Sequence, residues 1–83
     1  MTNRPVHEIR LGRIRASIWS NPGERGPLYS VSLCRLYKTD AGEWADSASF
    51  HRDDLLVVAK VADLAHTWVH EQSARDRLPA ADE

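Results

Sequence analysis

The feature that most constrains the fold is the segment from Asp53 to Ser73, which contains neither glycine nor proline. Its apolar residues recur every three or four positions, which is the spacing of an amphipathic helix. Asp53 or Asp54 can cap its N-terminus, where the helix dipole favours negative charge, and Pro79 lies beyond its C-terminal end. We predict one helix from these aspartates to about Ser73 or Ala74, roughly 30 Å long at 1.5 Å per residue.

The residues before this helix alternate between apolar and polar side chains, as strands do. Arg13 to Trp19 alternates cleanly, Leu28 to Lys38 is the longest candidate, and Glu43 to His51 is the last. Val6 to Leu11 is a shorter and less regular strand. We expect Gly12, which follows it, to form a bulge or kink.

Two segments rich in turn-forming residues separate these strands. Ser20 to Pro27 contains a Pro-Gly and a Gly-Pro pair, and Thr39 to Gly42 ends in a glycine suited to a positive φ. Connections this short join antiparallel neighbours. The sequence therefore predicts an α+β fold, an antiparallel four-stranded β-meander followed by one long C-terminal helix packed on one sheet face. We expect residues 1–75 to form a single domain and residues 76–83 a disordered tail.

The small size of the chain makes a partner subunit the expected source of extra stability. A chain of 83 residues forms one domain, and a core of this size contributes only a few kcal/mol. Cys34 is the single cysteine, so no internal disulfide forms, and a lone thiol fits a reducing compartment. No apolar run approaches the roughly 20 residues that span a bilayer, and the N-terminal residues do not resemble a signal peptide. We expect a soluble cytoplasmic protein that has no membrane partner.

The helix has more apolar surface than a single sheet can cover. One stripe consists of Val57, Val61, Leu64 and Trp68, and a second stripe beside it consists of Val58, Ala62, Ala65 and Val69. Together they span roughly half of the helix circumference, which is wider than a core-facing helix requires. We predict that the second stripe forms a homodimer interface with a partner helix, because alanines permit close approach. The alternative is a sheet curved enough to bury both stripes within one subunit.

Charge is divided unevenly along the chain. Residues 1–38 contain seven basic and two acidic residues, whereas residues 39–83 contain four basic and ten acidic residues. The net charge of −1 argues mildly against a nucleic-acid-binding protein, but a polarised chain can present a cationic face while remaining nearly neutral. The alternative is that the strands are basic and the helix and tail acidic without any common purpose.

The predicted meander leaves one face of the sheet uncovered. The helix is expected to cover the face that carries Ile14, Ala16, Ile18, Val31, Leu33 and Phe50. The opposite face then carries Arg13, Arg15, Ser17, Trp19, Ser30, Ser32, Cys34, Lys38, Ser47, Ser49 and His51. Single-stranded nucleic acid requires cations for its phosphates and aromatic rings for its bases, and this face supplies both. The alternative is an ordinary solvated face, which antiparallel sheets commonly have.

The order of strands followed by a terminal helix resembles a known family. The lead-in segment Ile9 to Ile18 and the junction Phe50 to Leu56, where the last strand passes directly into the helix, are similar to the positive cofactor four family of transcriptional coactivators and to the related Whirly proteins. The resemblance covers roughly residues 6 to 74. The segment Arg4 to Trp19 is also similar to short uncharacterised bacterial proteins, whose resemblance implies no function.

The resemblance to the coactivators implies a homodimer packed through its helices, with single-stranded DNA held across the sheets. The residues whose positions match the DNA-binding role are Arg13, Arg15, Trp19, Arg35 and Lys38. This chain departs from the family in its slightly acidic balance, in its arginines where lysines are usual, and in its long turn from Asn21 to Pro27.

Three other candidate functional motifs were considered, and each is better explained by an ordinary structural role. His66 and His70 have the spacing of a chelating pair on a helix, but no strong third ligand lies nearby in the sequence. Cys34 lies in the middle of a strand without a nucleophile signature. No glycine-rich loop leads from a strand into a helix to bind phosphate. We therefore expect neither an enzyme nor a metal or cofactor site.

The sequence thus predicts a homodimer that binds single-stranded DNA or RNA on a basic and aromatic sheet face, with a role like that of a transcription coactivator. The alternative is a protein-interaction or assembly module that does not bind nucleic acid. Salt-dependent binding of an oligonucleotide distinguishes the two.

Overall fold

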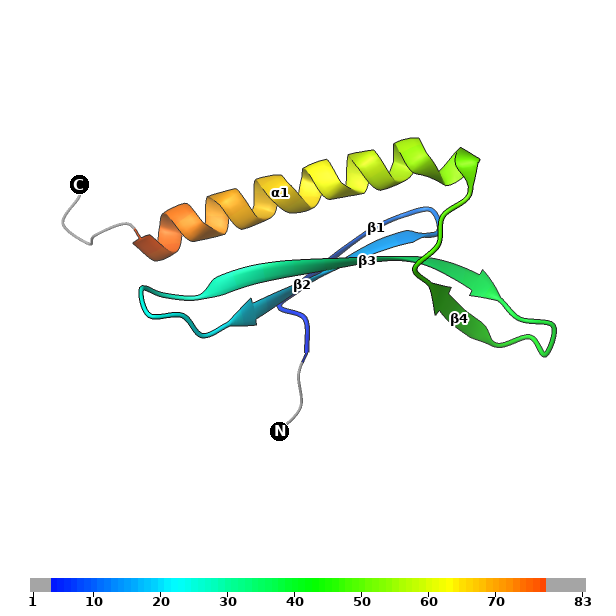
Figure 1. The fold of residues 1–83 in the computed structure, drawn as a ribbon, viewed down its shortest axis with the longest axis horizontal. Helices are drawn as coiled ribbons and strands as arrows, with labels where there is room; N and C mark the ends of the chain where they lie inside the picture. The colour runs from blue at the N-terminus through cyan, green and yellow to red at the C-terminus, as the bar shows by residue number, and fades with distance from the viewer. Residues whose placement is uncertain (1–3, 78–83) are drawn as a thin grey trace.

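The computed structural model describes residues 4–77, and it confirms the predicted α+β fold (Figure 1). The elements in chain order are β1 (His7–Leu11), β2 (Ile14–Asn21), β3 (Leu28–Lys38), β4 (Trp44–Ser47), a short 3₁₀-helix η1 (Arg52–Asp54) and the helix α1 (Leu55–Arg77). The helix thus extends a few residues beyond the predicted end. Residues 78–83 of the predicted tail lie outside the described residues.

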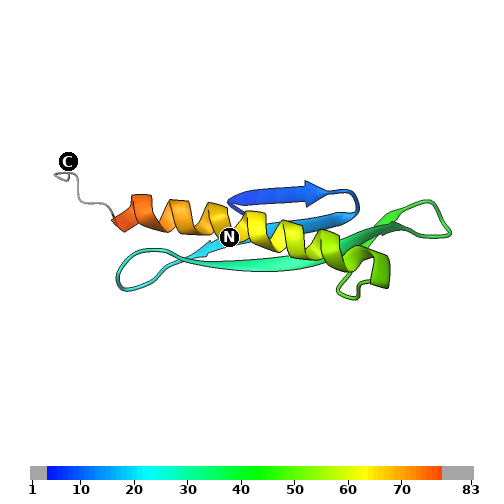
Figure 2. The same ribbon diagram turned by 90° about the horizontal axis from the view of Figure 1, so that it is seen from above.

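The four strands form one antiparallel sheet in the order β1-β2-β3-β4, with α1 lying across one face (Figures 1 and 2). Ala16 at the centre lies opposite Ile9 on β1 and Leu33 on β3. The short β4 pairs only with the end of β3, from Arg35 to Lys38. The rest of β3 is therefore an edge strand on the side away from β2.

The prediction of a bulge at Gly12 was wrong. Leu11 and Ile14 lie opposite each other, so Gly12 and Arg13 form a two-residue hairpin turn. Gly12 has φ 61°, the sign that a type II′ turn requires at its first central residue. Arg13 consequently lies in the turn and not in a strand. The second predicted turn is confirmed, since Gly42 has φ 85°.

The last strand is shorter than predicted. It ends at Ser47, not at His51, because the chain turns there: the backbone N–H of Ser49 donates to the Ser47 hydroxyl at 3.0 Å. Such a side-chain-to-backbone hydrogen bond competes with strand pairing. Ser49 and His51 therefore do not lie on the sheet, and Phe50 packs against the core under the helix.

The start of the helix also differs from the prediction, which gave Asp53 or Asp54 as the cap. His51 is the N-cap of the 3₁₀-helix that leads into α1. Its backbone N–H donates to Oδ2 of Asp54 at 3.0 Å. Asp54 therefore acts from the third position, as the acidic residue of a capping box does.

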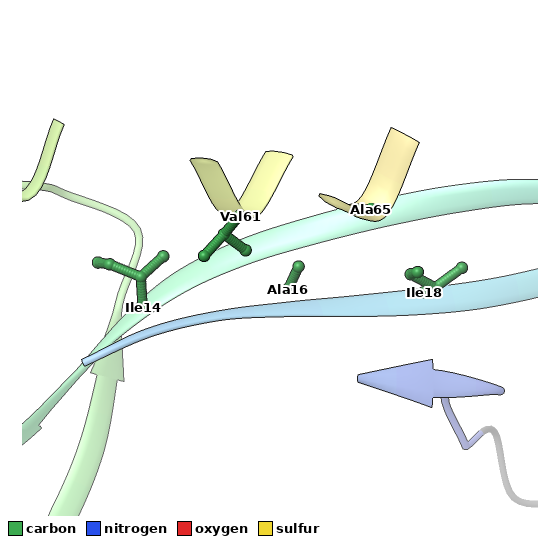
Figure 3. Close-up of a cluster of buried hydrophobic side chains, with 5 residues drawn as sticks. All are labelled: Ile14, Ala16, Ile18, Val61 and Ala65. Atoms are coloured by element: carbon green, nitrogen blue, oxygen red, sulfur yellow. The ribbon is translucent and has the colours of Figure 1, made fainter. Parts of the chain in front are cut away.

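The core is a thin layer between the sheet and one side of the helix. It consists of Ile14, Ala16, Ile18, Val61 and Ala65 (Figure 3). Around it, the ring of His7 stacks on that of Trp68 at 4.8 Å. The Cα radius of gyration of 15.6 Å exceeds the roughly 11–12 Å of a compact chain of this length. The chain is extended, with little buried apolar volume for its size.

Candidate functional site

The face of the sheet that points away from α1 is called the open face below. Strand register places these side chains on it: Glu8, Arg10, Arg15, Ser17, Trp19, Ser30, Ser32, Cys34, Leu36, Lys38, Trp44 and Asp46. Among residues 4–77, no helix or further strand covers this face (Figure 1). The prediction of an uncovered face agrees with this arrangement for Arg15, Trp19, Cys34, Lys38 and the serines of β2 and β3. It was wrong for four residues: Arg13 lies in the turn, Ser47 lies opposite Arg35 on the helix side, and Ser49 and His51 lie beyond the end of β4.

Two of the predicted binding residues, Arg15 and Trp19, lie on the central strand of the open face. The indole N–H of Trp19 donates to the Ser32 hydroxyl at 2.9 Å, which holds the ring across the neighbouring strand. Arg15 pairs with Asp46, with 3.1 Å between Nη2 and Oδ2. Its Nε atom is buried and has no hydrogen-bond partner. The Asp46 carboxylate thus partly neutralises the central arginine.

Arg35 lies on the opposite side of the sheet, under the start of the helix. Its Nε donates to the backbone oxygen of Ser49 at 3.2 Å and lies 3.7 Å from Oδ2 of Asp54. Its guanidinium also lies over the ring of Tyr37, 5.4 Å from the centroid. Only 15% of its side chain is exposed. Arg35 is therefore separated from Arg15 and Trp19 by the thickness of the sheet.

A shallow pocket of about 320 Å³ lies on the open face near β4, and we call it the Trp44 pocket. Its lining residues are Arg10, Arg15, Leu36 and Trp44. Trp44 is 62% exposed, and the Lys38 ammonium lies 6.0 Å from the centroid of its ring. Two guanidiniums, one ammonium and an exposed aromatic ring therefore meet at one end of the face.

Sequence reasoning missed Arg10 and Trp44. It treated the whole segment from Glu43 to His51 as one strand with Phe50 under the helix, and alternation along such a strand puts Trp44 on the same face as Phe50. The signal that was needed is the length of the turn: the Thr39 N–H donates to the Glu43 oxygen at 2.7 Å, so Glu43 belongs to the connection and Trp44 lies opposite Lys38. Strands joined by a hairpin pair across it, so Trp44 must share the face of its partner Lys38.

A second hollow lies on the helix side of the sheet, between α1 and β3. This β3 groove has a volume of about 310 Å³ and is lined by Tyr29, Val31, Leu33, Ala62, Ala65, His66 and Val69. Three residues of the predicted dimer stripe, Ala62, Ala65 and Val69, therefore line an apolar groove. Ala65 also belongs to the core, and Val58 and Val69 pack against it.

Among residues 4–77, the histidine pair on the helix belongs to no larger group of potential metal ligands. The rings of His66 and His70 stack 6.1 Å apart, and the described part of the chain contains no cluster of three or more potential metal-ligating histidine, cysteine or acidic residues. In the same residues, no helix combines the length and the apolar character that crossing a membrane requires.

Comparison of the chain with family models, with curated proteins and with solved structures finds no match. The resemblance to the coactivator family therefore stays a prediction that rests on the order of elements and on the segments quoted above.

Proposed function

We propose that this chain is a homodimer that binds single-stranded nucleic acid on its open face. The observation that carries the proposal is the Trp44 pocket, in which an exposed indole ring lies beside Arg10 and Arg15. Unpaired bases stack on aromatic rings, and phosphates bind cations. A nucleotide docked in this pocket would have both within reach.

The open face offers a path beyond this pocket. Trp19 lies opposite Ser30 and Trp44 lies opposite Lys38, so the two indoles are separated by roughly 26 Å along β3 at 3.3 Å per residue. Between them lie hydroxyl groups, including that of Ser32. Serines give hydrogen bonds without the bulk that would hold a strand away from the sheet. The arrangement supports a single strand lying along β3 with bases stacked at both ends.

The charge of the face supports modest affinity. Arg10, Arg15 and Lys38 are opposed by Glu8 and Asp46. If about three phosphates are contacted, log Kd changes with log salt with a slope of about 2, since each contact on a single strand contributes about 0.7. We therefore expect binding that is clear at low salt and weak at physiological salt.

The homodimer part of the proposal is supported by the small core. Among residues 4–77, six apolar residues are buried, whereas eight large apolar residues are exposed. Small domains of this kind often gain the missing burial from a second subunit.

Fluorescence anisotropy with a labelled single-stranded oligonucleotide tests nucleic-acid binding. We expect wild-type binding to weaken as salt rises, and the double variant Arg10→Ala/Arg15→Ala to bind at least about tenfold more weakly, since two phosphate contacts are lost. The matched control is Arg52→Ala/Lys60→Ala, which removes the same charge from exposed positions of η1 and α1. The absence of binding at low salt, or equal loss in both double variants, contradicts the proposal and favours the protein-interaction alternative.

A further inference from the structure

Much of β3 is an uncovered sheet edge. Because β4 pairs only with Arg35 to Lys38, the segment from Leu28 to Cys34 has no strand beside it on the side away from β2, among the residues that the structure describes (Figure 2). The N–H of Leu36 donates to the Arg13 oxygen at 2.7 Å, so the even-numbered residues direct their backbone groups toward β2. In an antiparallel ladder the alternate residues, which include Val31 and Leu33, direct theirs toward the open edge.

The same residues also present apolar side chains. Val31 and Leu33 line the β3 groove, and Val31 is 40% exposed. The segment from Leu28 to Cys34 contains no charged residue and no proline. Natural proteins normally protect an exposed edge with such residues, because a bare apolar edge pairs with other strands. The edge of β3 from Leu28 to Cys34 is therefore expected to pair with another strand.

We propose that a second copy of this chain covers it, through antiparallel pairing of the two β3 strands about a twofold axis at Val31. Val31 is the middle residue of the uncovered segment from Leu28 to Cys34. An axis there places each uncovered segment against the identical segment of the other copy. The backbone N–H and C=O of Val31 point toward the uncovered edge, so Val31 would form a hydrogen-bonded pair with Val31 of the second copy.

The fit to a second copy rests on length and on charge. The strand β4 ends at Ser47, opposite Arg35, so an incoming strand has only the space beside Leu28 to Cys34, and that segment fills the space when turned by the twofold axis. Neither copy brings a charge to the paired segment, so no repulsion opposes it. Isologous pairing of this kind closes after two subunits.

The inference rests on the homodimer part of the proposed function and gives it a specific geometry. Pairing through β3 joins the two sheets into one, with both helices on the same side. The β3 groove of each copy, including Ala62 and Val69, then faces the other helix. The two open faces become one continuous surface. The sequence predicted an interface formed by the helices alone. In this geometry the two β3 strands pair first, and the two helices pack above them as a second layer of the same interface.

Sedimentation velocity across a concentration series tests the pairing. We expect a dimer at tens of micromolar and at least a roughly tenfold weaker dimer for Val31→Lys, because the substitution brings two ammonium groups together in an apolar groove. The matched control is Leu56→Lys, which adds the same charge at a position that is 84% exposed and outside the groove. A wild-type chain that stays monomeric overturns the proposal and leaves the edge to a strand of a different protein.

Disulfide trapping keeps the test independent of folding defects in the lysine variant. In a Cys34→Ser background, Val31→Cys places two thiols across the axis on residues whose Cα atoms are about 5.5 Å apart, a distance that a disulfide spans. We expect rapid oxidation to a covalent dimer, and none for Leu56→Cys in the same background. A dimer that is insensitive to Val31→Lys and is not trapped by Val31→Cys overturns this geometry.

The variants of the open face separate this inference from nucleic-acid binding. Arg10→Ala/Arg15→Ala is expected to remain dimeric, because both arginines lie on the face opposite the groove. Absence of oligonucleotide binding by a dimeric wild-type chain would contradict only the nucleic-acid proposal, whereas binding by a monomeric wild-type chain would contradict only the dimer.

Discussion

Arg35 and Asp54 form an ion pair that ties the end of β3 to the start of the helix. The guanidinium Nε lies 3.7 Å from Asp54 Oδ2, and both side chains are mostly shielded from solvent. Asp54 also accepts the His51 N–H, and Arg35 also donates to the Ser49 oxygen. One largely shielded arginine thus holds the connection from β4 to α1, although the resemblance to the coactivators had implied that Arg35 contacts DNA.

We predict that Arg35→Ala lowers the free energy of unfolding by about 2–4 kcal/mol, because it leaves Asp54 and the Ser49 carbonyl without their charged partner. Urea denaturation followed by circular dichroism measures this change. The comparison is Arg52→Ala, whose pair with Asp53 at 3.8 Å is almost fully exposed and is therefore expected to contribute nothing measurable. Equal effects of the two substitutions would contradict the assigned role.

Gly12 is predicted to be required by the first hairpin. Its φ of 61° is unfavourable for residues that have a Cβ atom, and no other atom lies within 4 Å of a Cβ built there. The cost of substitution is therefore conformational alone. We expect Gly12→Ala to lower the free energy of unfolding by about 1–2 kcal/mol and Gly12→Asn by less, since asparagine tolerates this region better. A larger loss for Asn than for Ala in urea denaturation would contradict this explanation.

The order of elements follows from the sequence because it depends on local patterns. Alternation over Arg13 to Trp19 and over Leu28 to Lys38, and a helical segment free of glycine and proline, are each sufficient within a short window. The central strand β2 carries its aliphatic residues at every second position, so the predicted face of Ile14, Ala16 and Ile18 is the one that the helix buries.

The site was only partly predictable because it depends on where a strand ends. The hydrogen bond from the Ser49 N–H to the Ser47 hydroxyl stops β4 early, and apolar alternation gives no signal for such a bond. Extending the strand to His51 inverted the face assigned to Trp44. The position of Arg35 under the helix depends on Asp54, which is distant in sequence, and charge patterns do not reveal such a pairing.

Two apolar residues of the helix, Val61 and Leu56, are expected to differ clearly in their contribution to the free energy of unfolding. Val61 is fully buried against Ile14 and Ala16 (Figure 3), whereas Leu56 is mostly exposed. We expect Val61→Ala to lower the free energy of unfolding by about 2 kcal/mol, through lost burial and the cavity that remains. Leu56→Ala is expected to change it by less than about 0.5 kcal/mol. A substantial loss for Leu56→Ala in thermal or urea denaturation would show that its side chain is buried in solution.

Asp46 is predicted to limit the affinity of the open face for nucleic acid. Its carboxylate lies 3.1 Å from Arg15 Nη2 and is 55% exposed, so it both neutralises that arginine and repels phosphate. Asp46→Asn keeps the shape of the side chain and removes the charge. One exposed unit charge near a phosphate contributes about 1 kcal/mol, so we expect roughly fivefold tighter oligonucleotide binding at low salt. The gain should shrink as salt rises, because screening acts on the same repulsion.

The fold itself should be little affected by Asp46→Asn, since an exposed pair contributes at most about 1 kcal/mol. Asp53→Asn makes the same change in net charge at the start of the helix, away from the open face, and should leave the affinity unchanged. If Asp46→Asn binds no better than wild type in the anisotropy titration, Arg15 does not contact phosphate.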